Sequence, residues 1–276
     1  MLPEIFGINV YASATVLGYA FALSIGFYLC RLEGRPWRDL IELGIVIVIS
    51  GVLGAKVFHT LFEAAGHQLP DGSIAQGLFD LLKADPWHWA RLFEAGYVFY
   101  GGAVFGVLFS YIYLRRAGIE KIGGIGDAAA PGFAFGIGIG RLGCFAAGCC
   151  YGTPTTMPWA VHFGAGHPAA HQAIHPVQMY DAVYGLGVCA LSLLYFKRRK
   201  FNGELFCYFV MSYALWRFIT ELFRGDGDRG VWLGGLLSTS QLVSLSVLPF
   251  TLFFYLRERK RSLAEVATMG GEEARA

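Results

Sequence analysis

One stretch, residues 136–155 with the sequence GIGIGRLGCFAAGCCYGTPT, places reactive side chains in an otherwise apolar, glycine-rich setting. Its cation is Arg141, and its thiols are Cys144, Cys149 and Cys150. A guanidinium can hold a phosphate through two parallel N–H donors, and a thiolate is both a nucleophile and a metal ligand. The stretch therefore indicates anion binding, thiol chemistry or both.

A second group of charges lies in the segment YALWRFITELFR, residues 213–224. Its polar residues recur at helical spacing, which places them on one face of a helix: Tyr213, Arg217, Glu221 and Arg224. An Arg–Glu pair alone is equally typical of a polar contact between helices. Several arginines near the outer ends of membrane helices instead favour a phosphate site, and in lipid the available phosphate is a headgroup.

The composition is that of a polytopic membrane protein. Of the 276 residues, 55% are hydrophobic and 15% are charged, whereas a soluble protein carries roughly a quarter charged residues. The formal net charge of +2 is too small to suggest a nucleic-acid partner. The N-terminus MLPEIFGINVY lacks the basic region and cleavage site of a signal peptide, so we expect the first apolar segment to stay as a membrane span.

Seven apolar runs are long enough to cross the membrane as helices, which takes about 20 residues for about 30 Å of hydrocarbon. They lack the alternation that a transmembrane β-barrel requires. We therefore predict an all-α polytopic fold with seven transmembrane helices near residues 11–30, 40–62, 97–114, 126–148, 178–196, 204–223 and 233–256.

Basic segments set the predicted orientation. Lys and Arg gather after the first, third, fifth and seventh runs, in RLEGRPWR, LRRAGIEK, KRRK and RERKR. Because short cytoplasmic loops are the basic ones, we expect the N-terminus outside and the C-terminus in the cytoplasm. Residues 1–262 then form a single membrane domain with outer loops 63–96 and 149–177, and residues 263–276 form a short disordered cytoplasmic tail.

The cysteines fall into two groups. Three are isolated within spans and fit the role of small buried hydrophobes: Cys30, Cys189 and Cys207. For the three beside Arg141, several interpretations stay open. The first is that they pack as small residues or form a disulfide such as Cys144–Cys149, which requires a helix break at Gly148. The second is a catalytic or redox thiol, and the third is a metal ligand.

Small residues also recur at every fourth position of the fourth run, and such ladders let helices approach closely in lipid. They are Gly132, Gly136, Gly140, Cys144 and Gly148. Arg141 lies about 100° away from this ladder, so it can point into a cavity rather than into a neighbouring helix.

The second outer loop carries His162, His167, His171 and His175. Three of these histidines are four residues apart, but two prolines in GHPAAHQAIHP discourage a regular helix. Neither a CxxC nor an HExxH pattern is present. We therefore predict no metal and no cofactor.

Four segments agree in order and spacing with one known pattern over nearly the whole chain: YGG at 100–102, DAAAPGFAFGIGIGRLGCF at 127–145, HPVQMYD at 175–181 and YALWRFITELFR at 213–224. Together they resemble the prolipoprotein diacylglyceryl transferase family. The resemblance implies an enzyme of the bacterial cytoplasmic (inner) membrane with its active site toward the outer face. It implies transfer of the diacylglyceryl group of phosphatidylglycerol to the lipobox cysteine, in the signal-peptide region of a preprolipoprotein, with release of glycerol phosphate.

The resemblance also implies roles for individual residues. Arg141 matches the arginine of the family's G-R-x-G-N-F motif, and Arg217 matches the first arginine of its R-F-x-x-E-x-x-R helix. With two of the clustered thiols added for their own reactivity, the candidate catalytic residues are Arg141, Arg217, Tyr100, Cys149 and Cys150. The substrate-binding positions are Tyr11, Lys56, Gly101, Gly102, Cys144, Gly152, His175, Glu221 and Arg224.

Departures from the family pattern lie at positions that the resemblance assigns to the reaction. Tyr100 stands where the family has a catalytic histidine, Cys144 and Ala147 replace asparagines, and Cys149 replaces an acidic residue. Lys56 also stands in place of an arginine. The arginines that would bind the phosphate are thus kept. The positions of the family's polar and general-base residues carry other side chains instead, and two of these are thiols.

Three hypotheses follow for the function. The first is transfer of the diacylglyceryl group to a thiol acceptor, with Tyr100, His59 or a cysteine as the base. The second is a thiol-dependent lipid or redox enzyme of the same fold that uses Cys144, Cys149 or Cys150. The third is a non-catalytic phospholipid-binding or transport protein.

The basic loops predict the outcome of a topology experiment. Reporter fusions after residues 35, 118, 199 and 260 should report cytoplasm, and fusions after residues 75 and 165 should report the outer side, because Lys and Arg alternate between loops. Two inverted signals among the six would contradict the seven-span arrangement.

Overall fold

The computed structural model describes residues 4–5, 8–62, 99–118, 122–225, 231–232 and 236–273, and this part of the chain is mostly helical. Each of the seven predicted apolar runs contains one long helix. These helices are α1 (Val10–Leu32), α2 (Trp37–Phe62), α5 (Phe99–Arg116), α6 (Ile122–Ala147), α7 (Val177–Tyr195), α8 (Glu204–Thr220) and α9 (Thr239–Glu273). Among the described residues, five helices are long and apolar enough to cross a membrane: α2, α6, α7, α8 and α9.

Short elements flank the helices. The strands pair antiparallel as β1 (Glu4–Ile5) with β2 (Ile8–Asn9), and as β3 (Val231–Trp232) with β4 (Leu237–Ser238). The 3-10 helices η1 (Phe196–Arg198) and η2 (Glu221–Phe223) follow α7 and α8 directly. The predicted outer loop 63–96 lies outside the described residues.

The helices gather into two compact units, one of residues 1–35 with 121–276 and one of residues 36–120. The prediction of a single membrane domain over residues 1–262 stays a prediction. In the smaller unit, α2 packs on α5 through glycines. A Cβ on Gly102 would lie 2.8 Å from the carbonyl oxygen of Gly51, and one on Gly54 would overlap the carbonyl oxygen of Gly101. Only residues without a side chain allow this close crossing.

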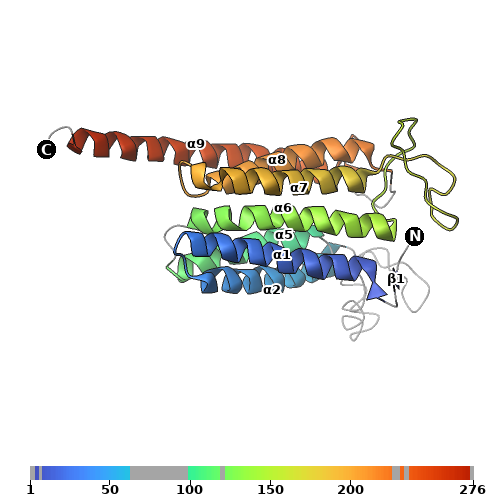
Figure 1. The fold of residues 1–276 in the computed structure, drawn as a ribbon, viewed down its shortest axis with the longest axis horizontal. Helices are drawn as coiled ribbons and strands as arrows, with labels where there is room; N and C mark the ends of the chain where they lie inside the picture. Colours follow the sequence, from blue (N-terminus) through green and yellow to red (C-terminus); the bar gives the residue numbers. More distant parts are fainter. Residues whose placement is uncertain are drawn as a thin grey trace. The chain divides into compact units, whose positions relative to one another are not determined.

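In the larger unit, α6 packs against α1, α7 and α8, while α9 packs along α8 (Figure 1). Glycines in α6 and in α7 make this close packing possible. A Cβ on Gly132 would lie 2.5 Å from the carbonyl oxygen of Ala22 in α1, and a Cβ on Gly185 in α7 would lie 2.7 Å from that of Ala134. The predicted ladder is confirmed at Gly132, whereas a Cβ on Gly136 or on Gly140 would meet only open space.

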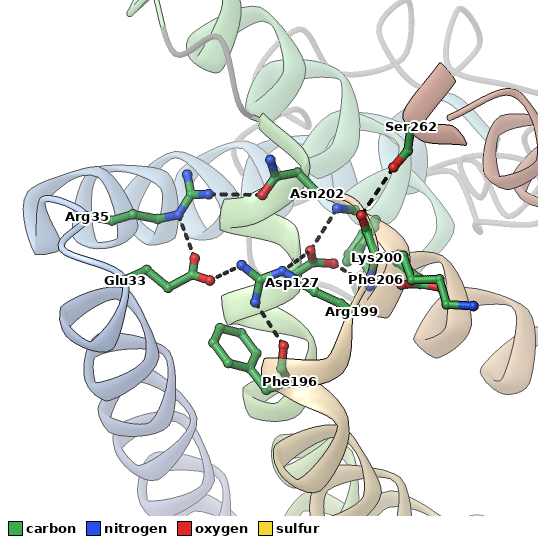
Figure 2. A network of polar contacts seen from close by, with 11 residues as sticks. Glu33, Arg35, Asp127, Phe196, Arg199, Lys200, Asn202, Phe206 and Ser262 are labelled. Carbon is green, nitrogen blue, oxygen red and sulfur yellow. Dashed lines mark hydrogen bonds and ion pairs between the residues drawn. The ribbon is translucent and has the colours of Figure 1, made fainter. Parts of the chain in front are cut away.

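A buried carboxylate joins the helices at one end of this unit (Figure 2). Asp127 of α6 is fully buried and accepts hydrogen bonds from the backbone N–H groups of Gly203 (2.7 Å) and Phe206 (2.9 Å), at the start of α8. Its Oδ2 also lies 3.2 Å from Nε of Arg199. The carboxylate therefore caps the N-terminus of α8, where the free N–H groups and the helix dipole favour a negative charge.

The same network gathers three of the four basic segments. Glu33 pairs with both Arg35 and Arg199, and Nη2 of Arg35 donates to the side-chain oxygen of Asn202 at 3.1 Å. The Ser262 hydroxyl donates to the carbonyl oxygen of Lys200 (3.2 Å; Figure 2). The basic sequences that follow α1, α7 and the apolar part of α9 thus lie at one end of the larger unit.

The predicted disordered tail needs a correction, because α9 is helical through Glu273. Extending an existing helix adds one hydrogen bond for each residue fixed and needs no new nucleus. Local contacts support the extension. Arg261 pairs with Glu258 at i and i+3 (3.6 Å), and the Thr268 hydroxyl donates to the carbonyl oxygen of Glu265 (2.8 Å).

Replacing Asp127 should be among the most destabilising single changes in this unit. Asp127→Ala would leave Arg199 without its buried partner and two N–H groups without an acceptor, and loss of one member of a buried pair costs roughly 3–5 kcal/mol. We expect a clear drop in the thermal midpoint of the purified protein in detergent. The control Arg261→Ala, which removes the exposed partner of Glu258, should change stability by no more than about 0.5 kcal/mol. Equal midpoints for the two variants would contradict the capping role.

Candidate functional site

The end of α6 brings the three clustered cysteines together. The Cys149 N–H donates to the carbonyl oxygen of Cys144 (3.1 Å), and the Gly148 N–H donates to that of Phe145 (3.1 Å). Gly148 has φ +75°. This is the Schellman arrangement, in which a glycine in the left-handed conformation ends a helix and turns the next residue back over the last turn. As a result, the sulfur atoms of Cys144, Cys149 and Cys150 all lie within 4.8 Å of one another.

Two buried side chains hold the backbone of this turn. Nε2 of His167 hydrogen-bonds to the carbonyl oxygen of Gly148 (2.7 Å), and Nε2 of Gln178 donates to that of Cys149 (2.8 Å). Cys150 itself has φ +60°, a conformation that residues with a side chain adopt rarely and at a cost. The two anchors help to maintain this backbone, so the surrounding structure fixes the position of the thiols.

The chain after the cysteines pairs with the end of α8. The N–H of Thr153 donates to the carbonyl oxygen of Phe223 (2.8 Å), and the N–H of Gly225 donates to that of Tyr151 (3.1 Å). Gly152 therefore lies opposite Arg224 in an antiparallel bridge. A Cβ on Gly152 would overlap the backbone of His175, so the predicted role of this glycine has a steric basis.

His175, a predicted substrate-binding residue, has structural partners. Its backbone N–H donates to the carbonyl oxygen of Thr153 (3.0 Å), and its Nδ1 hydrogen-bonds to the hydroxyl of Tyr180 (3.1 Å). Its ring also packs edge-on against Phe223. His175 thus supports the segment that holds Gly152 opposite Arg224.

Arg141 is held by a carboxylate that was not among the predicted site residues. Nε of Arg141 lies 3.2 Å from Oδ2 of Asp181 in α7, and Nε1 of Trp216 in α8 donates to Oδ1 of the same carboxylate at 2.8 Å. The side chain of Asp181 is nearly buried. One carboxylate therefore links α6, α7 and α8 and orients the guanidinium. An acidic residue inside an apolar run was the available signal for it, since such residues need a partner.

Arg217 forms the second arginine centre. Its Nη2 lies 2.6 Å from the buried Glu221 carboxylate and 3.1 Å from the hydroxyl of Ser240 in α9. Its Nη1 is buried and has no hydrogen-bond acceptor among the described residues. A buried charged donor left in this state is costly, so the arrangement suits an anionic ligand.

The predicted helical stripe of Tyr213, Arg217, Glu221 and Arg224 needs a correction at its end. The α-helix ends at Thr220, η2 forms a tighter turn, and Arg224 has extended backbone with φ −78° and ψ 138°. Pairing with Gly152 draws this residue out of the helix. Arg224 thus reaches the cysteine cluster from the loop and not from the helix face.

The remaining predicted site residues, which are Tyr11 of the larger unit and those of the smaller unit, are only partly described. Lys56 is buried within α2, and Gly101 and Gly102 lie at the close crossing of α2 with α5. The side chains of Tyr11, His59 and Tyr100 lie outside the described part of the structure. Their predicted roles stay predictions.

Electrostatics single out one thiol of the cluster. Hydrogen bonds from the thiols of Cys144 and Cys149 lower the pKa of Cys150, and the nearby guanidinium groups of Arg141 and Arg224 lower it further. Cys150 is therefore the group in the cluster that most readily carries negative charge. The thiolate is the reactive form of cysteine, as a nucleophile or as a metal ligand.

Helices long and apolar enough to cross a membrane, in a mostly helical chain, indicate a multi-pass membrane protein. The sequence pattern of the prolipoprotein diacylglyceryl transferase family matches residues 2–257, so the chain belongs to this family. The resemblance seen in the four motifs is confirmed, and with it the assignment of the chain to a family of transferase enzymes.

Individual relatives agree over nearly their full length. The phosphatidylglycerol–prolipoprotein diacylglyceryl transferase of Clostridium tetani is 28% identical over 265 residues, which cover 95% of this chain and 98% of that protein. The protein of the same name from Solidesulfovibrio magneticus is 30% identical over 258 residues, covering 91% and 90%. A second such enzyme of Clostridium perfringens is 29% identical over 261 residues, covering 92% and 93%.

Asp181 should be needed to hold the site together. Asp181→Ala removes both the charge beside Arg141 and the acceptor for Trp216, whereas Asp181→Asn keeps an acceptor and loses the charge. We expect Ala to lower the thermal midpoint in detergent more than Asn does, and both to lower it more than the exposed control Glu265→Ala, because an uncompensated buried charge is strongly destabilising. Midpoints for both Asp181 variants equal to that of the wild-type protein would contradict the role of this carboxylate.

Proposed function

We propose that this protein transfers the diacylglyceryl group of phosphatidylglycerol to the lipobox cysteine of preprolipoproteins. The observation that carries the proposal is the buried guanidinium of Arg217, whose Nη1 has no acceptor among the described residues. A phosphate oxygen would satisfy this donor. Arg141, oriented by Asp181, supplies a second guanidinium at the same end of α6, α7 and α8. Arginine suits this role because its planar fork matches a phosphate.

The proposed reaction is a displacement at carbon. The sulfur of the acceptor cysteine attacks the glyceryl carbon that carries the phosphate ester, a carbon–sulfur bond forms, and the carbon–oxygen bond breaks. Glycerol phosphate leaves with the electron pair of that bond. Arg141 and Arg217 stabilise the charge that develops on the leaving group, which is the electrostatic contribution that preorganised donors make.

The acceptor thiol must also lose its proton. Tyr100, which stands at the position of the family's catalytic histidine, His59 and the clustered cysteines remain the candidate bases. Lys56, Tyr11, Gly101 and Gly102 remain predicted contacts of the substrate, as do Gly152, His175, Glu221 and Arg224. Catalytic roles for Cys149 and Cys150 likewise stay predictions, and the assay described below includes their serine variants.

We further propose seven spans in the bacterial cytoplasmic (inner) membrane, with the N-terminus outside and the C-terminus in the cytoplasm. The basic segments that share the end of the larger unit near Asp127 support a cytoplasmic position for that end. Because α6 runs from Asp127 toward Arg141, the arginine–thiol site would then face outward. That is the side on which the signal-peptide region of an exported preprolipoprotein becomes available.

A reconstituted assay tests the transfer directly. Purified protein is mixed with labelled phosphatidylglycerol and a synthetic lipobox peptide, and the products are glycerol phosphate and a peptide heavier by one diacylglyceryl group. We expect both products from the wild-type chain. We expect neither from Arg141→Ala and strongly reduced amounts from Arg141→Lys, since an ammonium cannot reproduce the bidentate contact. Arg259→Ala, in the basic segment of α9, serves as the matched control.

Three outcomes of this assay would contradict the proposal. Lipid binding without either product would indicate a binding protein, and full activity of Arg141→Lys would exclude the bidentate contact. Labelled lipid trapped on Cys149 or Cys150, and absent from the corresponding serine variant, would replace direct transfer with a covalent thiol intermediate.

A further inference from the structure

The cysteine cluster at the end of α6 is not explained by packing. A cysteine that acts as a small hydrophobe is buried, as Cys30, Cys189 and Cys207 are. Cys149 is exposed, and Cys144 and Cys150 are half-buried. All three are free thiols, and their sulfur atoms lie within 4.8 Å of one another.

The backbone around the cluster is built to keep the thiols together. The Schellman turn at Gly148 places Cys149 over Cys144, and the left-handed conformation of Cys150 (φ +60°) returns the third thiol to the same point. His167 and Gln178, both buried, hold the two carbonyl groups of the turn. Sites that bind an ion need this kind of support, in which outer groups fix the ligands before the ion arrives.

We propose that Cys144, Cys149 and Cys150 form a three-thiolate binding site for a thiophilic divalent cation such as Zn²⁺. Soft thiolate ligands select ions of this class. Zn–S bonds of about 2.3 Å in tetrahedral geometry place the sulfur atoms roughly 3.8 Å apart, so small side-chain rotations close the cluster around an ion. On binding, each thiol releases its proton to solvent and forms a sulfur–metal bond, with no change in oxidation state.

The charges around the cluster fit this ion. Three thiolates and one divalent cation leave a net charge of −1, and the guanidinium groups of Arg141 and Arg224 lie within electrostatic range of Cys150. The carbonyl groups at the C-terminus of α6 add partial negative charge, which favours a cation. A disulfide would use only two of the three thiols and would leave the third without a function.

The fourth coordination position belongs to a ligand from outside the cluster. Among the described residues, no histidine or carboxylate joins the three sulfur atoms. His167 is unsuitable, because its Nε2 bonds to the carbonyl oxygen of Gly148 and its Nδ1 accepts the N–H of Ala169 (2.9 Å). Water is then the expected fourth ligand. The ion would tie the last turn of α6 to the segment that pairs Gly152 with Arg224, and so fix that arginine.

The absence of CxxC and HExxH spacings led to the prediction of no metal site. In this chain the spacing is CxxxxCC, and the third ligand is usable only because a helix cap and a left-handed residue fold the segment back. The inference does not depend on the transferase reaction, since the ligands, their spacing and their support are independent of any substrate.

Metal binding to the full-length protein tests the site directly. Protein purified in detergent and reductant is loaded with Zn²⁺ alone and desalted, and bound zinc is measured by elemental analysis. We expect one ion per chain. Serine at position 144, 149 or 150 should weaken binding by more than the roughly 10–100-fold that loss of an outer-shell partner costs. The matched control Cys189→Ala, which removes a buried cysteine of α7, should bind as the wild-type protein does.

A second measurement needs no variant and so does not depend on the folding of one. Zn²⁺ should protect Cys144, Cys149 and Cys150 together from alkylation by a maleimide, as read by peptide mass spectrometry. With Cd²⁺ as the probe, the ultraviolet thiolate-to-metal band should saturate at one ion per chain.

Each contrary outcome would overturn the site. Zinc retained by the triple serine variant would assign the ion to other groups. Unchanged alkylation in the presence of Zn²⁺, or a disulfide among these cysteines in protein taken directly from membranes, would show that the thiols do not act as ligands. Full transferase activity in a protein that binds no zinc would leave the proposed function intact and reject the metal site alone.

Discussion

Two buried carboxylates fix α6, α7 and α8 to one another, one near each end of α6. Asp127 caps the N-terminus of α8 and pairs with Arg199, which follows α7. Asp181 of α7 pairs with Arg141 of α6 and accepts the indole N–H of Trp216 in α8. Among apolar helices, a charge is tolerated only where a partner neutralises it, so each carboxylate fixes the positions of the groups around it. The rest of the site depends on this arrangement.

The arginine centres show how such pairing can leave capacity for a ligand. Arg141 uses Nε for Asp181, and Arg217 uses Nη2 for Glu221 and Ser240. In each case the carboxylate holds the guanidinium by one edge. The buried Nη1 of Arg217 finds no hydrogen-bond acceptor among the described residues. A guanidinium with one edge fixed is preorganised, because little side-chain entropy remains to be lost when an anion binds.

The loop after α6 links this phosphate-binding half to the thiol cluster. Gly152 lies opposite Arg224, and no side chain would fit between this glycine and His175. The same strand-like pairing draws Arg224 away from the helix. The left-handed Cys150 lies two residues before Gly152. Strain of this kind persists only where surrounding contacts maintain it, and here His167 and Gln178 provide those contacts.

Much of this protein follows from sequence alone, for physical reasons. Long apolar runs predict helices because a backbone in lipid must satisfy its own hydrogen bonds, and each predicted run does contain a helix. Motif order predicts the family, since the residues within each motif, such as Arg217 and Glu221, and the order of the motifs can be read directly from the chain. The end of α9 was predicted wrongly, because composition alone does not show that an existing helix continues into a polar segment.

Only the tertiary structure shows which residues distant in sequence contact one another. Nothing local to Arg141 indicates that Asp181, 40 residues later, is its counter-ion, or that Trp216 shares that carboxylate. The departure of Arg224 from the helical stripe depends on pairing with Gly152, which lies 72 residues earlier. The helix break at Gly148 was predicted, but the return of Cys150 to the other two thiols depends on its left-handed backbone, which its residue type does not indicate. Sequence specifies which groups are present, but packing and backbone conformation determine which of them meet.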